Sequence, residues 1–146
     1  MKKLSIVSVV IIAFTFISST VFAQTDDREI VKDRLLELFN LSLESNYTEA
    51  ASYCVYRGSD ESREWKDVCN YEYEEDIKDV KGICNRIKKY LDESIEYSFG
   101  EFSTESESEG VWTVWEVIFV KGNNESYKRY FCFLEINGKY AIGDID

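Results

Sequence analysis

The sequence of 146 residues contains no histidine and no proline. Histidine is the side chain that most readily exchanges a proton near neutral pH and is the commonest metal ligand, so its absence excludes Cys/His nucleophilic pairs and mixed Cys/His zinc sites. Because proline is absent, no helix or strand interior is interrupted by a residue without an N–H donor. A phosphate-binding glycine loop, a nucleophile elbow and a dinucleotide fingerprint are also missing. These absences exclude the common signatures of covalent and nucleotide-dependent enzymes.

Basic residues are scarce, with 17 Lys and Arg against 28 Asp and Glu and a net charge of −11. A negative field of this size repels nucleic acid phosphates and anionic lipid headgroups, and it favours basic or cationic partners. We therefore expect no binding to nucleic acid.

Long apolar runs are missing except at the start of the chain. Lys2 and Lys3 precede an apolar run from Leu4 to Ile17, and small residues follow up to Ala23. This order is typical of a secretory signal peptide, and the run is short for a bilayer span of about 20 residues. We expect residues 1–23 to be a signal peptide and residues 24–146 to form a single domain, exported to the periplasm or the extracellular space. Removal of two lysines would leave 15 basic and 28 acidic residues, a net charge of −13.

Four cysteines lie in the part of the chain that would be exported: Cys54, Cys69, Cys84 and Cys132. An even number of cysteines in an exported chain favours disulfides, and the spacings of 15, 15 and 48 match no C-x-x-C motif. Three pairings are possible. The preferred one joins Cys54 to Cys69 and Cys84 to Cys132, and isolated buried thiols are the alternative.

The first half of the domain has helical patterns. Asp26 and Glu29 form a capping box, and apolar residues then recur at a spacing of 3.6 up to about Glu44. Asn46 and Glu49 repeat the capping arrangement and predict a short second helix that ends before Gly58. Residues 59–72 are polar and predict a connector held by Trp65 and Cys69. A long third helix follows from about residue 73 to 92, with Gly82 as its one poor helix former.

After residue 92 the period changes from 3.6 to 2, which predicts strands over about 95–103, 111–120, 126–136 and 139–145, with a polar loop over 104–110. Asn137-Gly138 favours a type I′ turn and would pair Ile136 with Lys139. The predicted fold class is α+β, with three helices packed on a curved four-stranded antiparallel meander.

The predicted register divides the last hairpin into two faces that are both largely apolar. One face carries Tyr130, Cys132, Leu134, Ala141, Gly143 and Ile145, and the other carries Phe131, Phe133, Tyr140, Ile142 and Asp144. Residues 111–120 are apolar on both sides too. An antiparallel sheet with one wet face should alternate polar and apolar residues. We therefore expect both faces to be covered, the second by a pocket, a wrapped helix or another subunit.

This order of helices and strands, closed by FxFLEINGKYAIGDID with Lys139-Tyr140-Ala141-Ile142, resembles the nuclear transport factor 2-like superfamily of cone-shaped α+β proteins, in particular its small exported bacterial members without an assigned activity. The early β-hairpin that many members carry is not evident in residues 59–72. Enzymes of this superfamily, of isomerase and dehydratase types, place Asp, His or Tyr acid/base groups inside the cone. The resemblance implies that a catalytic site here would use Asp and Tyr.

Candidate catalytic residues are therefore Tyr97, Tyr140 and Asp144, each with the alternative that it only packs or meets solvent. Candidate ligand-binding residues are Tyr53, Tyr56, Arg57 and Trp65 near the end of the second helix, with Trp115 of the sheet; the alternative is that they close the end of the core. Alternating Glu105, Glu107 and Glu109 lack a cation-binding loop pattern, so no metal and no cofactor are predicted.

The composition and the resemblance favour an exported non-catalytic domain that binds a small ligand or a protein, with a homodimer through the outer sheet face as one option. Two other classes stay open. One is a pocket enzyme with Asp/Tyr acid/base chemistry, and the other is an acidic inhibitor or immunity-type protein for a basic partner.

Overall fold

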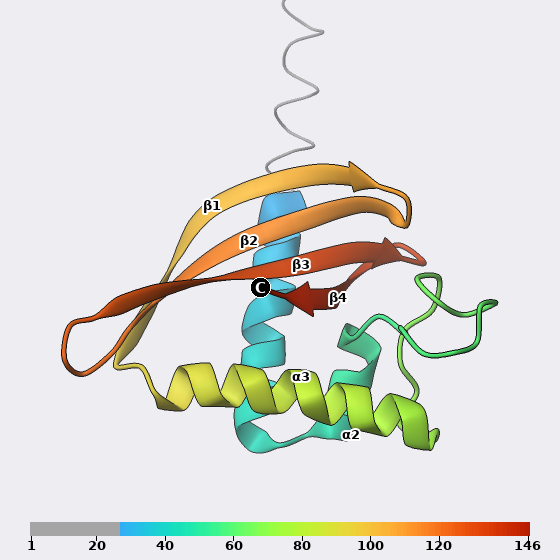
Figure 1. Ribbon diagram of the computed structural model, residues 1–146, viewed down its shortest axis with the longest axis horizontal. Coiled ribbons are helices and arrows are strands. Elements are labelled where there is room, and N and C mark those ends of the chain that lie inside the picture. Colours follow the sequence, from blue (N-terminus) through green and yellow to red (C-terminus); the bar gives the residue numbers. More distant parts are fainter. Residues whose placement is uncertain (1–26) are drawn as a thin grey trace, which may run out of the picture. The chain divides into compact units, whose positions relative to one another are not determined.

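The computed structural model describes residues 27–146. The chain divides into two units, Met1–Ile30 and Val31–Asp146, and residues 27–30 of the first unit are helical. The predicted signal peptide and the predicted cap at Asp26 lie outside the described residues. Within the second unit the fold class is α+β, as predicted, with helices and a four-stranded antiparallel sheet (Figure 1).

The helical elements precede the sheet. A helix that ends at residue 44 is followed by α2, Tyr47–Ala50, by a 3₁₀ turn, Ala51–Tyr53, and by the long α3, Glu74–Asp92. Asn46 caps α2 as predicted: its side-chain oxygen accepts from the Glu49 N–H and its Nδ2 donates to Glu49 Oε2 at 2.9 Å. Among the described residues, no helix combines the length and the apolar character that crossing a membrane requires.

The second helix is shorter than the sequence predicts. It ends at Tyr53, and Cys54 is extended, with φ −112° and ψ 133°. The reason is a set of contacts with distant segments: Val55 donates its N–H to Ile142 O at 2.8 Å, and Val55 also pairs with Val68 in an antiparallel bridge. Backbone pairing with the sheet and the connector therefore replaces the last predicted helical turn.

The sheet has the strand order β1-β2-β3-β4, with β1 Glu96–Glu107, β2 Gly110–Val120, β3 Ser126–Ile136 and β4 Lys139–Ile145. Ile136 pairs with Lys139 and both turn residues have positive φ, which confirms the predicted hairpin. The predicted loop 104–110 is wrong, because β1 continues to Glu107 and pairs with the first residues of β2. Polar side chains are compatible with this part of the ladder because it is exposed.

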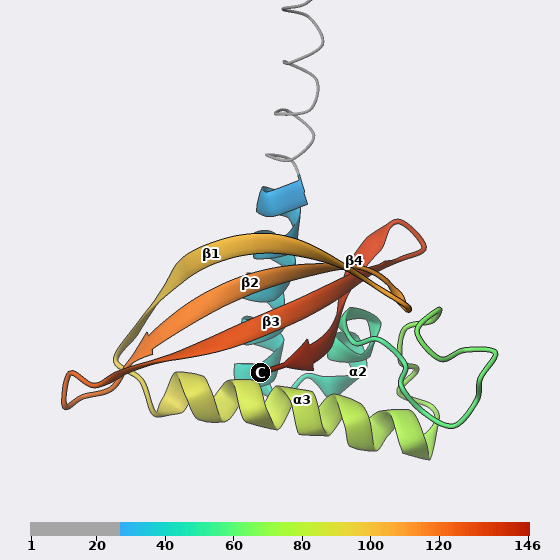
Figure 2. The same cartoon turned by 45° about the horizontal axis from the view of Figure 1, so that its top comes forward.

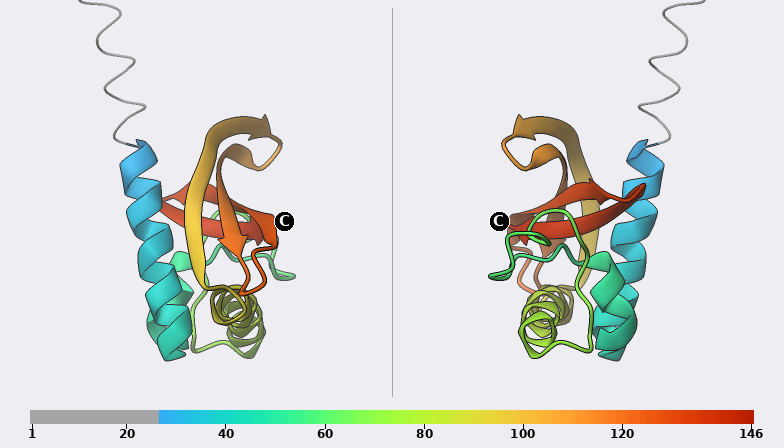
Figure 3. Two further views of the ribbon diagram at one scale, coloured as in Figure 1. Left: turned by 90° about the vertical axis from the view of Figure 1, so that its left-hand side faces the viewer. Right: turned by 90° about the vertical axis from the view of Figure 1, so that its right-hand side faces the viewer.

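The main core lies between the helices and one face of the sheet. Phe39 of the first helix contacts Phe131 edge-on at 5.4 Å, and Tyr90 of α3 lies 5.7 Å from Phe119. Both contacts bring a helix onto the face that carries Trp115, Val117 and Phe119. The views in Figures 2 and 3 show α3 running along the sheet, whose strands change direction strongly from β1 to β4. This twist is the usual right-handed twist of an antiparallel sheet.

The outer face of the sheet is partly covered by the segment between the 3₁₀ turn and α3, residues 54–73, which is longer than the predicted connector of residues 59–72 and is called the connector from here on. A second buried cluster forms there from Val55, Leu134, Ile136 and Ala141, with Trp65, Val68 and Trp112 packed against it. The Trp65 and Trp112 rings meet edge-on at 5.6 Å. The cover of this end of the second face is therefore the chain's own connector, which also pairs with the β4 edge. Further along the face, Val114, Ile118 and Val120 are half-buried.

The predicted faces of the hairpin are wrong at its open end. A β-bulge after the Phe133–Ile142 pair shifts the register by one residue, so that Cys132 pairs with Asp144 and Phe131 with Ile145. The shift places apolar Ile145 on the core face with Phe131 and takes the Asp144 carboxylate away from it. Burying the isoleucine instead of the charge favours this register.

Candidate functional site

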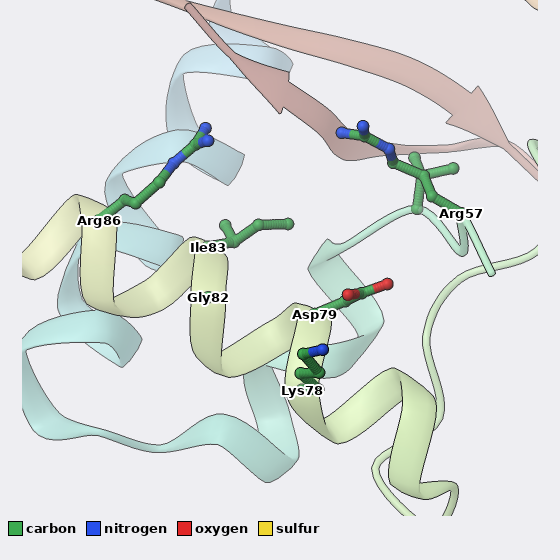
Figure 4. Close-up of a pocket in the computed structure, with 7 residues that line it drawn as sticks. Arg57, Lys78, Asp79, Gly82, Ile83 and Arg86 are labelled. Atoms are coloured by element: carbon green, nitrogen blue, oxygen red, sulfur yellow. The ribbon is translucent and has the colours of Figure 1, made fainter.

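A groove of about 410 Å³ lies beside α3 (Figure 4). It is lined by Val55 and Arg57 from the connector and by Lys78, Asp79, Gly82, Ile83 and Arg86 from α3. Its volume is within the usual range for small-ligand sites, about 300–1,000 Å³. The groove is the best candidate for a ligand site in the described part of the chain.

The α3 side of the groove follows from helical spacing. Lys78, Gly82 and Arg86 are each four residues apart, so they share one face of the helix. Gly82 carries no side chain, and a Cβ built at this position meets nothing within 4 Å. Glycine inside a helix costs about 1 kcal/mol relative to alanine. The fold therefore has no steric need for this glycine, and its visible effect is to keep the middle of the groove open.

Arg57 from the connector and Arg86 from α3 both reach across the groove to the end of β4. Arg57 Nη1 donates to the Gly143 carbonyl and lies 3.3 Å from Asp144 Oδ1. Arg86 Nη2 donates to the Ile145 carbonyl at 2.8 Å and lies 3.8 Å from the same Asp144 oxygen. Figure 4 shows both guanidinium groups extended toward the strand. One carboxylate and two carbonyls at the end of β4 thus hold two cations in place.

The bulge in β4 is what makes this arrangement possible. Without the extra residue, Asp144 would pair with Phe131 on the core face. With it, Asp144 pairs with Cys132, and its carboxylate meets the two arginines. Bulges are known to redirect side chains next to functional sites.

The predicted ligand-binding residues divide between this groove and the core. Arg57 lines the groove. Trp65 is not a lining residue, but its ring lies 5.4 Å from the Arg57 guanidinium. Tyr53, Tyr56 and Trp115 are buried and do not line the groove. Tyr53 has a guanidinium, that of Arg34, 3.5 Å from its ring, and burial raises its pKa to about 12. The Tyr56 hydroxyl donates to Glu75 at 3.1 Å and accepts from the Asp60 N–H.

The predicted catalytic residues are not gathered into one site. Tyr97 is on β1 and meets Phe39 at 5.4 Å, whereas Tyr140 and Asp144 are on β4 at the opposite edge of the sheet. Tyr140 packs against the core, and Asp144 is paired with Arg57 and Arg86. The Asp144 oxygen Oδ1 is therefore directed at the two arginines.

The four thiols are free in this structure, and three of them share the main core. Cys69 donates its N–H to the Cys54 carbonyl at 2.8 Å, so these two cysteines lie opposite each other on adjacent segments. Burial raises the pKa of Cys54 well above its ordinary value and that of Cys69 to about 12. Thiols that hold their protons so tightly are poor nucleophiles at neutral pH.

The other two cysteines are set apart. Cys84 is buried in the core. Cys132 is half-buried, pairs with Asp144 and lies on the outer face of the sheet, opposite to the face that carries Phe131 and Phe133. The arrangement suits the predicted pair Cys54 and Cys69 and gives no support to a pair of Cys84 with Cys132. Disulfide formation itself stays a prediction.

The α3 residues of the groove were missed by the sequence reasoning. The step of four from Lys78 through Gly82 to Arg86 was available as a signal, because a glycine between two cations on one helical face is unusual in an otherwise regular amphipathic helix. Within residues 27–146, no three acidic or cysteine side chains are placed to hold a metal ion, and this includes the alternating Glu105, Glu107 and Glu109.

No protein-family model, no curated protein and no solved structure matches this chain. The functional argument therefore depends on the geometry of the groove.

Proposed function

We propose that this chain is an exported, non-catalytic binding domain that holds a small ligand in the groove between Arg57 and α3. The observation that carries this proposal is Gly82, which weakens its helix at a point where only the open volume of the groove depends on it. The half-buried Ile83 supplies an apolar surface there, and the charged side chains around it supply orientation.

The resemblance to the nuclear transport factor 2-like superfamily is part of the same proposal. Helices followed by a four-stranded meander are compatible with it, and the backbone bridge between Val55 and Val68 occurs where many members carry an early hairpin. Binding without chemistry is favoured over Asp/Tyr catalysis, because Asp144 is engaged by two arginines and Tyr97 is on the other edge of the sheet.

A pair of variants at Gly82 tests the proposal. Alanine and leucine are both strong helix formers, but only leucine would fill the groove. Amide NMR spectra of the protein are recorded with a fragment set that contains acids, bases and neutral molecules of similar size. We expect saturable shifts at residues around the groove for part of this set, kept in Gly82→Ala and lost in Gly82→Leu. Shifts that survive in Gly82→Leu, or no saturable groove shifts from any fragment, would refute the proposal.

A further inference from the structure

The groove has the opposite charge to the chain around it. Three of its seven lining residues are basic and one is acidic, whereas the whole chain has 28 acidic residues against 17 basic ones. The three basic side chains come from two segments, Arg57 from the connector and Lys78 and Arg86 from α3. Positive charge gathered at one place gives anions a local point of attraction on a protein that otherwise repels them.

The two guanidinium groups are already positioned. Each is anchored by a backbone carbonyl of β4 and by the shared Asp144 carboxylate, through Nη1 of Arg57 and Nη2 of Arg86. A guanidinium has five N–H donors, so these contacts leave donors on both groups for a further acceptor. Because the side chains are held before a ligand arrives, little conformational entropy is lost on binding.

Lys78 adds a third cation at the other end of the same helical face. Its side chain is exposed, and it has no ion pair within residues 27–146. Asp79 is the groove's one acidic lining residue and lies one position further along α3. Gly82 and Ile83 lie between Lys78 and Arg86 along α3, and the half-buried Ile83 side chain offers contact to a small hydrocarbon body (Figure 4).

From this geometry we infer that the ligand is a small organic oxyanion, with a carboxylate or phosphate group bound between Arg57 and Arg86 and an apolar body on Ile83. Charge-assisted hydrogen bonds from arginine to these groups are the strongest that a protein offers to a small ligand. This inference depends on the proposed ligand groove and adds the chemical class of the ligand. Asp144 competes with the ligand's oxyanion for the same two guanidinium groups.

The test uses probes of one shape and different charge. Benzoate, its neutral counterpart benzamide, and inorganic phosphate are titrated into the protein at constant ionic strength, and binding is followed by amide NMR. We expect saturable shifts around Arg57, Gly82 and Arg86 for benzoate, for phosphate or for both, and none for benzamide. Saturation by benzoate alone assigns a carboxylic acid, and saturation by phosphate alone assigns a phosphate ester.

Two variants give changes of opposite sign. Arg86→Gln removes a charged donor and should weaken the oxyanion about tenfold or more. Asp144→Asn keeps an oxygen that can accept from the Ile145 N–H but removes the competing charge, so the oxyanion should bind more tightly than to the unchanged protein. A gain in affinity cannot come from damage to the fold.

The outcomes separate this inference from the proposed function. If benzamide binds as well as benzoate and Gly82→Leu abolishes both, the groove is a ligand site and the anion assignment is wrong. If the anions cause only linear, unsaturable shifts at scattered lysines, or if Arg86→Gln and Asp144→Asn leave benzoate and phosphate binding unchanged, the anion assignment is also wrong. If no probe or fragment of any charge saturates the groove, the proposed function fails as well.

Discussion

Arg63 and Asp76 form an ion pair in which Arg63 Nη2 lies 2.9 Å from Asp76 Oδ2, and Asp76 is only 1% exposed. The same oxygen accepts from the Asn70 N–H at 2.6 Å. The Arg63 guanidinium also lies 3.9 Å from the Tyr56 ring. Asp76 is in the first turn of α3 and Arg63 is in the connector, so this pair joins the two segments that border the groove.

Asp76→Ala should lower the free energy of unfolding by about 3 kcal/mol, because it leaves Arg63 without its buried partner. This figure is at the lower end of the usual range, since the Arg63 side chain is 23% exposed and keeps part of its hydration. Chemical denaturation measures the change. Asp67→Ala is the matched control: Asp67 also faces Arg63, at 3.6 Å, but is exposed, so its loss should cost less than about 1 kcal/mol. Equal effects of the two variants would contradict the prediction.

Gly82→Ala should stabilise the protein by about 0.8 kcal/mol, since alanine is the better helix former and a Cβ at this position meets nothing within 4 Å. The midpoint of thermal or urea unfolding measures the effect. Gly143→Ala serves as the contrast, because its Cβ would lie 2.6 Å from the Trp112 ring and should destabilise the protein. If Gly82→Ala is destabilising, the glycine has a structural role that the open space around it does not reveal.

The protein should lose stability as the pH falls from neutral to acid, because of Glu116. The Lys128 ammonium donates to Glu116 Oε2 at 2.8 Å and, as the largest influence, lowers the pKa of this carboxyl. A lowered pKa in the folded state stabilises the protein above the unfolded value of about 4.3, and this contribution is lost as the pH falls through the folded value. Urea unfolding at a series of pH values from neutral down to acid tests this.

The matched variants for this pH series are Glu116→Gln and Glu135→Gln. Glu116→Gln should be less stable than the unchanged protein at neutral pH, and the difference should shrink as the pH falls below the unfolded pKa. Glu135 is exposed and has no ion pair among residues 27–146, so its variant should keep the acid dependence of the unchanged protein. A difference that grows toward acid pH would contradict the assignment.

Local sequence chemistry predicts the elements that depend on neighbouring residues. Asn137-Gly138 gives the β3–β4 turn because both residues tolerate positive φ, and the spacing of apolar residues gives α3. The elements that were missed depend on distant partners. Helix two ends early because Val55 pairs with Ile142, and the bulge in β4 exists because Ile145 is buried in preference to Asp144. Neither competition is visible in a window of sequence.

The same distinction applies to the groove. The positions of Lys78, Gly82 and Arg86 on one helical face follow from their spacing alone. The approach of Arg57 does not, because it depends on the path of the connector and on the Gly143 carbonyl. The family resemblance pointed to Tyr97, Tyr140 and Asp144 inside a cone. Asp144 contacts Arg57 and Arg86 of the groove, whereas Tyr97 meets Phe39 and Tyr140 packs against the core.

Cys54 and Cys69 are placed to form a disulfide. On exposure to a disulfide oxidant such as glutathione disulfide, Cys54 and Cys69 should form a bridge, since their segments are hydrogen-bonded directly opposite each other. Closing a loop of this length stabilises a protein by about 3 kcal/mol. Mass spectrometry of the unreduced, alkylated protein should show this bridge and two free thiols, Cys84 and Cys132, and reduction should lower the free energy of unfolding. Cys132→Ser, which lies outside the core, should leave the bridge and its effect intact. A Cys84–Cys132 bridge, or four free thiols after oxidation, would contradict the prediction.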